Sequence, residues 1–291
     1  MSRAAGVARA ALIAAIAMVG VSDLACVRAG GKPASLTQAA AGVDSATVAL
    51  WRFDEATGVR CADSGPMHLD GTAGPGTRAS YGRFASAREF TRVMDSFVYV
   101  PYDQTMDRTG SLTVEAWVYV QSYGDYDVTP IVARWTQEGN QQSWWLGIVG
   151  RRLLFGSPSA PLGSVPSGQA GQLVFEFQPD EAGPPRAFAS TQRVALQRWT
   201  HVAATLDGSV VRFFIDGRLD AQYATRGHIQ ASAAPMLVGN YFDTRQLTSF
   251  GGELRVNPVG DATATYAFEG SIDELRLSSV ARGEFPGTGA R

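Results

Sequence analysis

Aromatic residues that stand beside polar ones carry the most suggestive chemistry in this sequence. The segments Tyr123–Asp127 (YGDYD) and Gly239–Asp243 (GNYFD) combine rings with Asp or Asn in expected loops. Aromatic rings stack on the apolar C–H faces of sugars, while neighbouring carboxylates and amides bind sugar hydroxyls. The candidate ligand-binding residues are Tyr123, Tyr126, Trp135, Trp144, Trp145 and Tyr241.

The alternative role for these rings is to fill a hydrophobic core or to cover a sheet. Trp144 and Trp145 are adjacent, so in a strand their side chains point to opposite faces. One of the two is therefore expected outside the core between two sheets. Core packing is the simpler interpretation for any single ring, whereas a binding surface is the hypothesis for the set.

Catalytic motifs are missing from the sequence. It contains no Gly-x-Ser-x-Gly elbow, no His-Glu-x-x-His, no phosphate loop and no metal-binding spacing of Cys and His. Glycoside hydrolysis needs two carboxyl groups about 5 to 10 Å apart in one cleft. The nearest pair, Asp273 and Glu274, is adjacent in sequence and so points to opposite faces of a strand. A binding protein is therefore favoured over a polysaccharide-cleaving enzyme, and no catalytic residue is assigned.

Charge and length limit the possible partners. The chain has 291 residues, a formal net charge of −2 and a pI of about 5.9. No bulk positive field is present to attract nucleic acid, so no nucleic-acid partner is expected.

The first 29 residues resemble an export signal in their order of features. Arg3 and Arg9 precede an apolar stretch from Ala10 to Val21, which is too short to span a bilayer. We therefore expect an extracytoplasmic protein that is secreted, periplasmic or lipid-anchored at the cell surface, with no transmembrane span.

Three cleavage sites are compatible with the residues that follow. Leu24-Ala25-Cys26 resembles a lipoprotein box with its signal ending at 25, although Asp23 stands where such boxes have an aliphatic residue. Cleavage after Ala29 or after Ser22 are the alternatives. Cys26 is thus a candidate lipidation site, and we expect contact with a membrane only if Cys26 is acylated. A bridge from Cys26 to Cys61 is possible only with cleavage after Ser22.

The pattern after residue 45 is almost entirely typical of β-strands. Residues 30–45 are small and polar and predict a flexible tether, residues 46–282 a single all-β domain, and residues 283–291 a tail. Apolar residues alternate from Leu112 to Val120, which is the period of a strand. Residues 156–170 and 178–190 are rich in Pro, Gly and Ser and predict long loops.

Two Asp-Gly dipeptides, at 207–208 and 216–217, flank an apolar-rich run. Asp-Gly suits the positive φ angles of tight hairpin turns. The segment from 199 onward therefore predicts three consecutive antiparallel strands.

Four segments together resemble bacterial laminin G-like jelly-roll domains. They are VALWRFDEATGVRCADSGPMHLDGTAG near the start, LTVEAWVYV, WTHVAATLDG with FFIDG, and the closing FEGSIDELRLSSVAR. The resemblance implies a concanavalin A-like jelly-roll sandwich of two antiparallel sheets. It also implies that the Asp residues of the two turns serve backbone geometry.

The resemblance further suggests a calcium site, because relatives of this fold often bind calcium. The opening and closing segments lie near each other in such folds, so Asp54, Asp70 and Asp273 are the candidate ligands. The alternative is that these carboxylates cap turns. The chain is thus expected to be an exported, non-catalytic module for carbohydrate or glycoconjugate, with calcium as a possible ion. A surface-protein or adhesion partner is the alternative.

Overall fold

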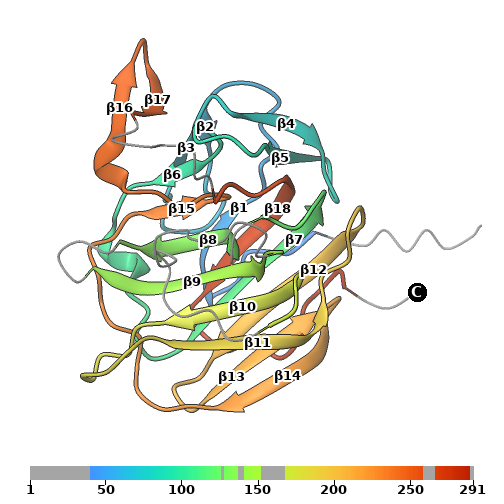
Figure 1. Ribbon diagram of the computed structural model, residues 1–291, viewed down its shortest axis with the longest axis vertical. Coiled ribbons are helices and arrows are strands. Elements are labelled where there is room, and N and C mark those ends of the chain that lie inside the picture. Colours follow the sequence, from blue (N-terminus) through green and yellow to red (C-terminus); the bar gives the residue numbers. More distant parts are fainter. Residues whose placement is uncertain (1–39, 126–127, 137–140, 152–167, 258–265, 289–291) are drawn as a thin grey trace, which may run out of the picture. The chain divides into compact units, whose positions relative to one another are not determined.

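Antiparallel β-strands make up nearly all of the regular structure of this chain (Figure 1). The structure is a computed structural model and describes residues 40–125, 128–136, 141–151, 168–257 and 266–288. All of these lie in one compact unit, Gln38–Arg291. Two short 3-10 turns, η1 (Gln104–Met106) and η3 (Thr244–Gln246), are the helical elements in these ranges, and neither could cross a membrane.

The first sheet, here called sheet A, has eight strands. In spatial order they are β14 (Arg218–Ala224), β13 (Val210–Ile215), β12 (Trp199–Leu206), β7 (Leu112–Val120), β18 (Gly270–Ser278), β5 (Ser86–Phe90) and β4 (Thr77–Tyr81), with β1 (Thr47–Trp51) also paired to β18. The expected neighbourhood of the opening and closing segments is thereby confirmed, because Trp51 pairs with Leu275.

The second sheet, sheet B, also has eight strands. They are β11 (Arg186–Arg193), β10 (Gln172–Phe177), β9 (Gln142–Val149), β8 (Val128–Trp135), β15 (Met236–Val238), β6 (Val98–Val100), β3 (Gly71–Ala73) and β2 (Arg60–Cys61). In Figure 1 strands β8 to β11 lie in front of the strands of sheet A. A separate hairpin of β16 (Leu247–Phe250) and β17 (Glu253–Val256) projects beyond the sheets.

The main core lies between the two sheets. Val114 and Val118 of sheet A belong to the same buried cluster as Leu146 and Phe175 of sheet B. Alternate residues of each strand face this cluster because successive side chains of a strand point to opposite sides. The all-β sandwich of two antiparallel sheets predicted from the sequence is confirmed.

The paired Asp-Gly turns connect β12 to β13 and β13 to β14, as predicted. Asp216 and Gly217 have φ angles of 49° and 74°, and Gly208 has 87°. The Asp207 carboxylate accepts hydrogen bonds from the backbone N–H groups of Ser209 and Val210. These aspartates therefore stabilise backbone geometry.

Some elements differ from the prediction. Residues 178–190 were expected to be a loop, but strand β11 begins at Arg186. The β4–β5 hairpin was not expected, because Thr77–Tyr81 has few of the β-branched and apolar residues that indicate strands. The predicted tail also packs on the domain in part, since Phe285 and Thr288 are buried.

Candidate functional site

The outer face of sheet A carries the polar and aromatic residues of strand β7. Leu112, Val114, Ala116, Val118 and Val120 face the core, so Thr113, Glu115, Trp117 and Tyr119 face outward. This face is divided along the strand: Thr113, Glu115 and Trp117 are buried, and Tyr119 is partly exposed. The two halves have different roles.

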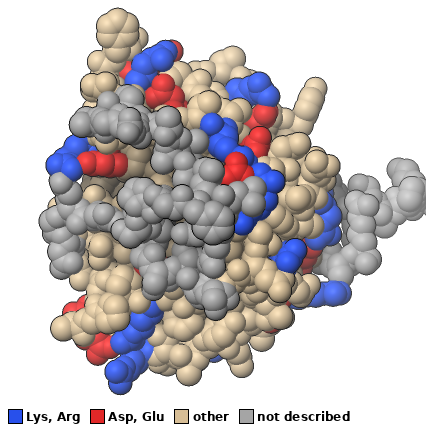
Figure 2. Space-filling view, in the orientation of Figure 1, with Lys and Arg blue, Asp and Glu red and all other residues tan. Residues whose placement is uncertain are grey.

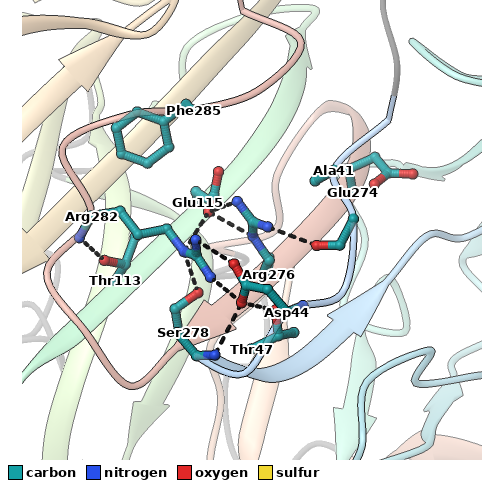
Figure 3. A network of polar contacts seen from close by, with 12 residues as sticks. Ala41, Asp44, Thr47, Thr113, Glu115, Glu274, Arg276, Ser278, Arg282 and Phe285 are labelled. Carbon is teal, nitrogen blue, oxygen red and sulfur yellow. Dashed lines mark hydrogen bonds and ion pairs between the residues drawn. The ribbon is translucent and has the colours of Figure 1, made fainter.

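At the Glu115 end, the face is occupied by a network of charged side chains (Figure 3). Glu115 accepts a hydrogen bond of 2.7 Å from Arg276 Nε, and His201 Nε2 lies 3.0 Å from its other oxygen. Burial by itself would raise the pKa of Glu115, but the bonds from His201 and Arg276 outweigh burial and hold this pKa below its usual range. The carboxylate is therefore ionised and paired, which a buried charge requires.

Residues from both ends of the described chain close over this network. Figure 3 shows Arg282 pointing toward Asp44, and Arg282 Nη2 lies 2.7 Å from Asp44 Oδ1. Arg276 donates to the carbonyl of Gly42, and the Phe285 ring lies 5.0 Å from His201. Residues 41–46 and 279–288, here called the terminal clasp, thus cover the Glu115 end of the face. Because the terminal clasp covers the Glu115 end, this part of the face has a structural role.

At the Tyr119 end, the same face forms an open groove of about 440 Å³, here called the aromatic groove. Its main lining residues are Tyr81, Glu89, Tyr119, Trp199, Glu269 and Ser271. The strand register explains how they meet. Trp199 pairs with Tyr119, Tyr119 with Ser271, and Ser271 with Glu89, so one row of side chains crosses β12, β7, β18 and β5.

Aromatic rings form one side of the aromatic groove. The Trp199 and Tyr119 rings lie 5.8 Å apart between centroids, at an interplanar angle of 59°. Both are partly exposed, and Tyr81 at the end of β4 is 95% exposed. A large aromatic side chain that stays in solvent beside two other rings is the arrangement expected of a stacking surface for a ligand.

Two carboxylates complete the groove, and each is held by an arginine. Arg78 Nη2 lies 2.5 Å from Glu89, and Arg92 Nη2 lies 2.6 Å from Glu269. Ser122 also donates to Glu269. These contacts fix the carboxylate oxygens as hydrogen-bond acceptors next to the rings.

Charge elsewhere on the surface is mixed. In Figure 2 basic and acidic side chains lie beside one another on the described part of the visible face. This agrees with ion pairs such as Arg245 with Asp243 and Arg255 with Glu253. No single-sign field that would attract a polyelectrolyte is visible over those residues.

Most of the rings predicted to bind a ligand are buried. Trp144 lies in the core between the sheets, while Trp145, Trp135 and Tyr241 form a second cluster on the outer face of sheet B. The expectation that the two adjacent tryptophans point to opposite faces is confirmed, but neither offers an open ring because their exposed fractions are 1% and 0%. The ligand-binding role of these rings stays a prediction.

The two remaining tyrosines of the predicted set are Tyr123 and Tyr126. Tyr123 is partly buried, and its hydroxyl donates to the carbonyl of Val194. Tyr126 lies outside the described residues, as does the candidate lipidation site Cys26. Cys61 is a buried thiol, and burial raises its pKa to about 11.

The predicted calcium ligands Asp54, Asp70 and Asp273 do not form a ligand set. Asp70 is paired with Arg60, while Asp273 accepts a hydrogen bond from the backbone N–H of Phe84. Within the described ranges, no group of three or more His, Cys, Asp or Glu is placed to hold a metal ion. A calcium ion at these three positions stays a prediction.

The aromatic groove was not predicted from the sequence. Its Tyr119 belongs to the outward side of the Leu112–Val120 alternation, which is a signal that could have pointed to it. Tyr81 and Glu89 lie in the unexpected β4–β5 hairpin. Only the register of five strands brings these residues together.

Two facing antiparallel sheets with a hydrophobic core between them define a β-sandwich of the jelly-roll class. Residues 94–284 match the family model described as the concanavalin A-like lectin/glucanases superfamily. The chain belongs to this family, and the predicted resemblance is confirmed. No curated protein sequence matches the chain.

Solved structures show the same fold at low identity. Domain 4 of AbnA, a GH43 extracellular arabinanase from Geobacillus stearothermophilus solved in complex with arabinotriose, is similar with a TM-score of 0.53 and 17% identity, over 84% of this chain and 96% of that chain. The binding domain of Paraclostridial Mosquitocidal Protein 1 is similar with a TM-score of 0.54 and 13% identity, over 81% of this chain. The botulinum neurotoxin serotype G binding domain is similar with a TM-score of 0.53 and 11% identity, over 83% of this chain. The chain spans 49% of each of these two binding domains.

Proposed function

We propose that this protein is an exported carbohydrate-binding module and that its ligand lies in the aromatic groove. The observation that carries the proposal is the partly exposed Trp199–Tyr119 ring pair with the fully projecting Tyr81 beside it. Rings in this position offer a stacking surface for the C–H face of a sugar.

The polar residues of the groove suit the hydroxyl groups of the same ligand. Glu89 and Glu269 are charged acceptors fixed by Arg78 and Arg92, and Ser271 adds a hydroxyl. Charged acceptors form the stronger class of hydrogen bonds. Because each carboxylate is already neutralised by an arginine, the groove favours an uncharged saccharide.

Binding is better supported than hydrolysis. Glu269 stands two residues before Ser271, which pairs with Glu89, so the Cα atoms of the two glutamates are diagonal neighbours about 7 to 8 Å apart. An inverting glycosidase needs two carboxyl groups about 6.5 to 9.5 Å apart, and one of them must carry a proton. Here Arg78 and Arg92 hold the two glutamates as hydrogen-bond acceptors, which suits the binding of hydroxyl groups.

The similar structures support the same ligand class. Domain 4 of the arabinanase AbnA was solved with arabinotriose, and the chain covers nearly all of it. Export belongs to the proposal because Arg3, Arg9 and the apolar stretch that follows have the order of a signal. Mass spectrometry of the mature N-terminus tests it: an acylated Cys26 indicates a surface lipoprotein, Gly30 indicates release, and an intact Met1 contradicts export.

The binding proposal is tested with a glycan panel and the purified full chain. The panel contains neutral, uronic, sulfated and amino-bearing polysaccharides, each in calcium and again in EDTA. Neutral glycans are expected to bind, and loss of binding in EDTA would show that binding depends on calcium. Binding restricted to protein partners, with no glycan retained, would contradict the proposal and favour an adhesion module.

A further inference from the structure

A second row of side chains, one step along the same strands, repeats the chemistry of the aromatic groove. Trp117 pairs with Asp273, just as Tyr119 pairs with Ser271. Two residues along a strand correspond to about 7 Å, so Trp117 follows Tyr119 at that spacing on the same face. An aromatic ring and an oxygen acceptor thus stand side by side in both rows.

The two rows differ in that the second is covered. The cover is the turn of the β4–β5 hairpin, residues Gly82–Ala85, here called the hairpin tip. The Arg83 guanidinium lies over the Trp117 ring, 4.7 Å from its centroid, and the Phe84 ring meets Trp117 edge to face at 6.0 Å. Together with the His201 ring, which lies 5.6 Å from Trp117, these contacts leave Trp117 only 7% exposed.

The contacts of the hairpin tip are of the kind that a sugar would make with this row. Arg83 occupies the ring face on which a sugar would stack. The backbone N–H of Phe84 donates to Asp273 Oδ2 at 2.9 Å, in the way that a sugar hydroxyl would donate to this carboxylate. The tip therefore imitates a ligand.

Asp273 adds an observation that the cover does not explain. This side chain is 0% exposed, and its second oxygen, Oδ1, has no hydrogen-bond partner. Buried polar atoms almost always have partners, so the unused acceptor beside Trp117 is open to a bond from an ordered water or from a ligand hydroxyl.

The hairpin tip also continues directly into the wall of the open groove. Tyr81 precedes Gly82 in the chain, and Ser80 Oγ lies 3.1 Å from Ser271 Oγ in the groove. Ala85 has a φ of 41°, a conformation that costs free energy in a residue other than glycine. Displacement of the tip would join the two rows into one surface.

We propose that the hairpin tip is a lid over a second saccharide subsite formed by Trp117 and Asp273. The proposal rests on carbohydrate binding in the aromatic groove and extends it. A short neutral saccharide fills the open row alone, whereas a longer one displaces Arg83 and Phe84 and occupies both rows.

The lid is tested with Arg83→Ala/Phe84→Ala in the full chain. Both side chains lie in a turn, so the variant keeps the core intact. The matched control is Arg255→Ala/Phe250→Ala, the same two residue types on the β16–β17 hairpin, where Phe250 is 78% exposed. The probes are arabino-, xylo- and gluco-oligosaccharides of two to six units, titrated by calorimetry.

The lid predicts that the first variant binds the longest oligosaccharide about tenfold more tightly than the wild type, which is about 1.4 kcal/mol. Binding of the disaccharide is expected to stay unchanged, and the control should match the wild type throughout. Equal gains for short and long probes, or no gain, would overturn the lid while leaving the groove proposal in place. Failure of the wild type to bind any probe would overturn both.

Hydrogen exchange gives a second measurement that needs no variant. The backbone N–H of Phe84 is bonded to Asp273 when the lid is closed. Its exchange should become faster when the wild type is saturated with the hexasaccharide and should not change with the disaccharide. Slower or unchanged exchange with the hexasaccharide would contradict the lid.

Discussion

Glu176 is a carboxyl group buried on the outer face of sheet B, and its replacement by Gln is a direct test of the structure. It stands opposite Trp145 on β9 and Ala187 on β11. It is 0% exposed, and among the described residues the Trp145 indole is the polar group beside its carboxyl. Burial raises its pKa from the ordinary 4.5 to about 8, and the nearby Trp145 indole lowers it only in part.

The raised pKa makes the stability of the protein depend on pH. The folded chain keeps Glu176 protonated up to about pH 8, whereas the unfolded chain loses this proton above about pH 4.5. The contribution of Glu176 to the free energy of unfolding is therefore fully present below pH 4.5. Between pH 4.5 and 8 it falls by about 1.4 kcal/mol per pH unit, and above pH 8 it is lost. The expected loss is about 3 kcal/mol at pH 7 and about 5 kcal/mol at pH 9.

Glu176→Gln removes this ionisable group while keeping the size of the side chain. Urea unfolding at several pH values between 4.5 and 9 measures the free energy of unfolding of the wild type and the variant. The free energy of unfolding of the variant, relative to that of the wild type, is expected to increase steadily as the pH rises from 4.5 to 8. Glu181→Gln, at a glutamate whose side chain is 47% exposed, is the control and should follow the wild type. Parallel profiles for wild type and Glu176→Gln would refute the assigned burial of this carboxyl.

Two further predictions concern turns and the buried network. Gly208→Ala and Gly217→Ala both place a side chain at positive φ, which costs about 1 to 2 kcal/mol, but only the Cβ at position 217 would overlap the Thr288 side chain. Urea unfolding should show the larger loss for Gly217→Ala, and equal losses would contradict the packing of Thr288. Glu115→Ala leaves the buried Arg276 without its partner and is expected to lower the free energy of unfolding by about 3 to 5 kcal/mol. A loss below about 1 kcal/mol would show that the network is open to water.

Much of the fold follows from local patterns. The Asp-Gly turns predict the β12–β13–β14 meander because the positive φ angles of a tight turn depend only on the residues of the turn itself. The alternation in Leu112–Val120 defines which side of β7 meets the core for the same reason. Strand β4 could not be predicted in this way, because Thr77–Tyr81 has no apolar pattern of its own and is stabilised by pairing with β5.

The site was harder to predict because it depends on what covers each face. Trp145 points away from the main core as expected, yet it is buried in a second cluster with Trp135 and Tyr241. Conversely, Tyr119 and Trp199 look like ordinary strand residues, and they become a surface only because the terminal clasp stops short of them. Coverage by distant segments is a tertiary property that spacing along one strand does not encode.

The central claim is that a saccharide binds in the aromatic groove, and one calorimetric comparison tests it most directly. The glycan retained most tightly in the panel is titrated into the wild type, Tyr81→Ala and Tyr102→Ala. Tyr81 lines the groove and is 95% exposed, whereas Tyr102 lies outside the groove lining and is 41% exposed. The account predicts an affinity at least about tenfold lower for Tyr81→Ala and an unchanged affinity for Tyr102→Ala. Equal affinities for all three proteins would contradict it.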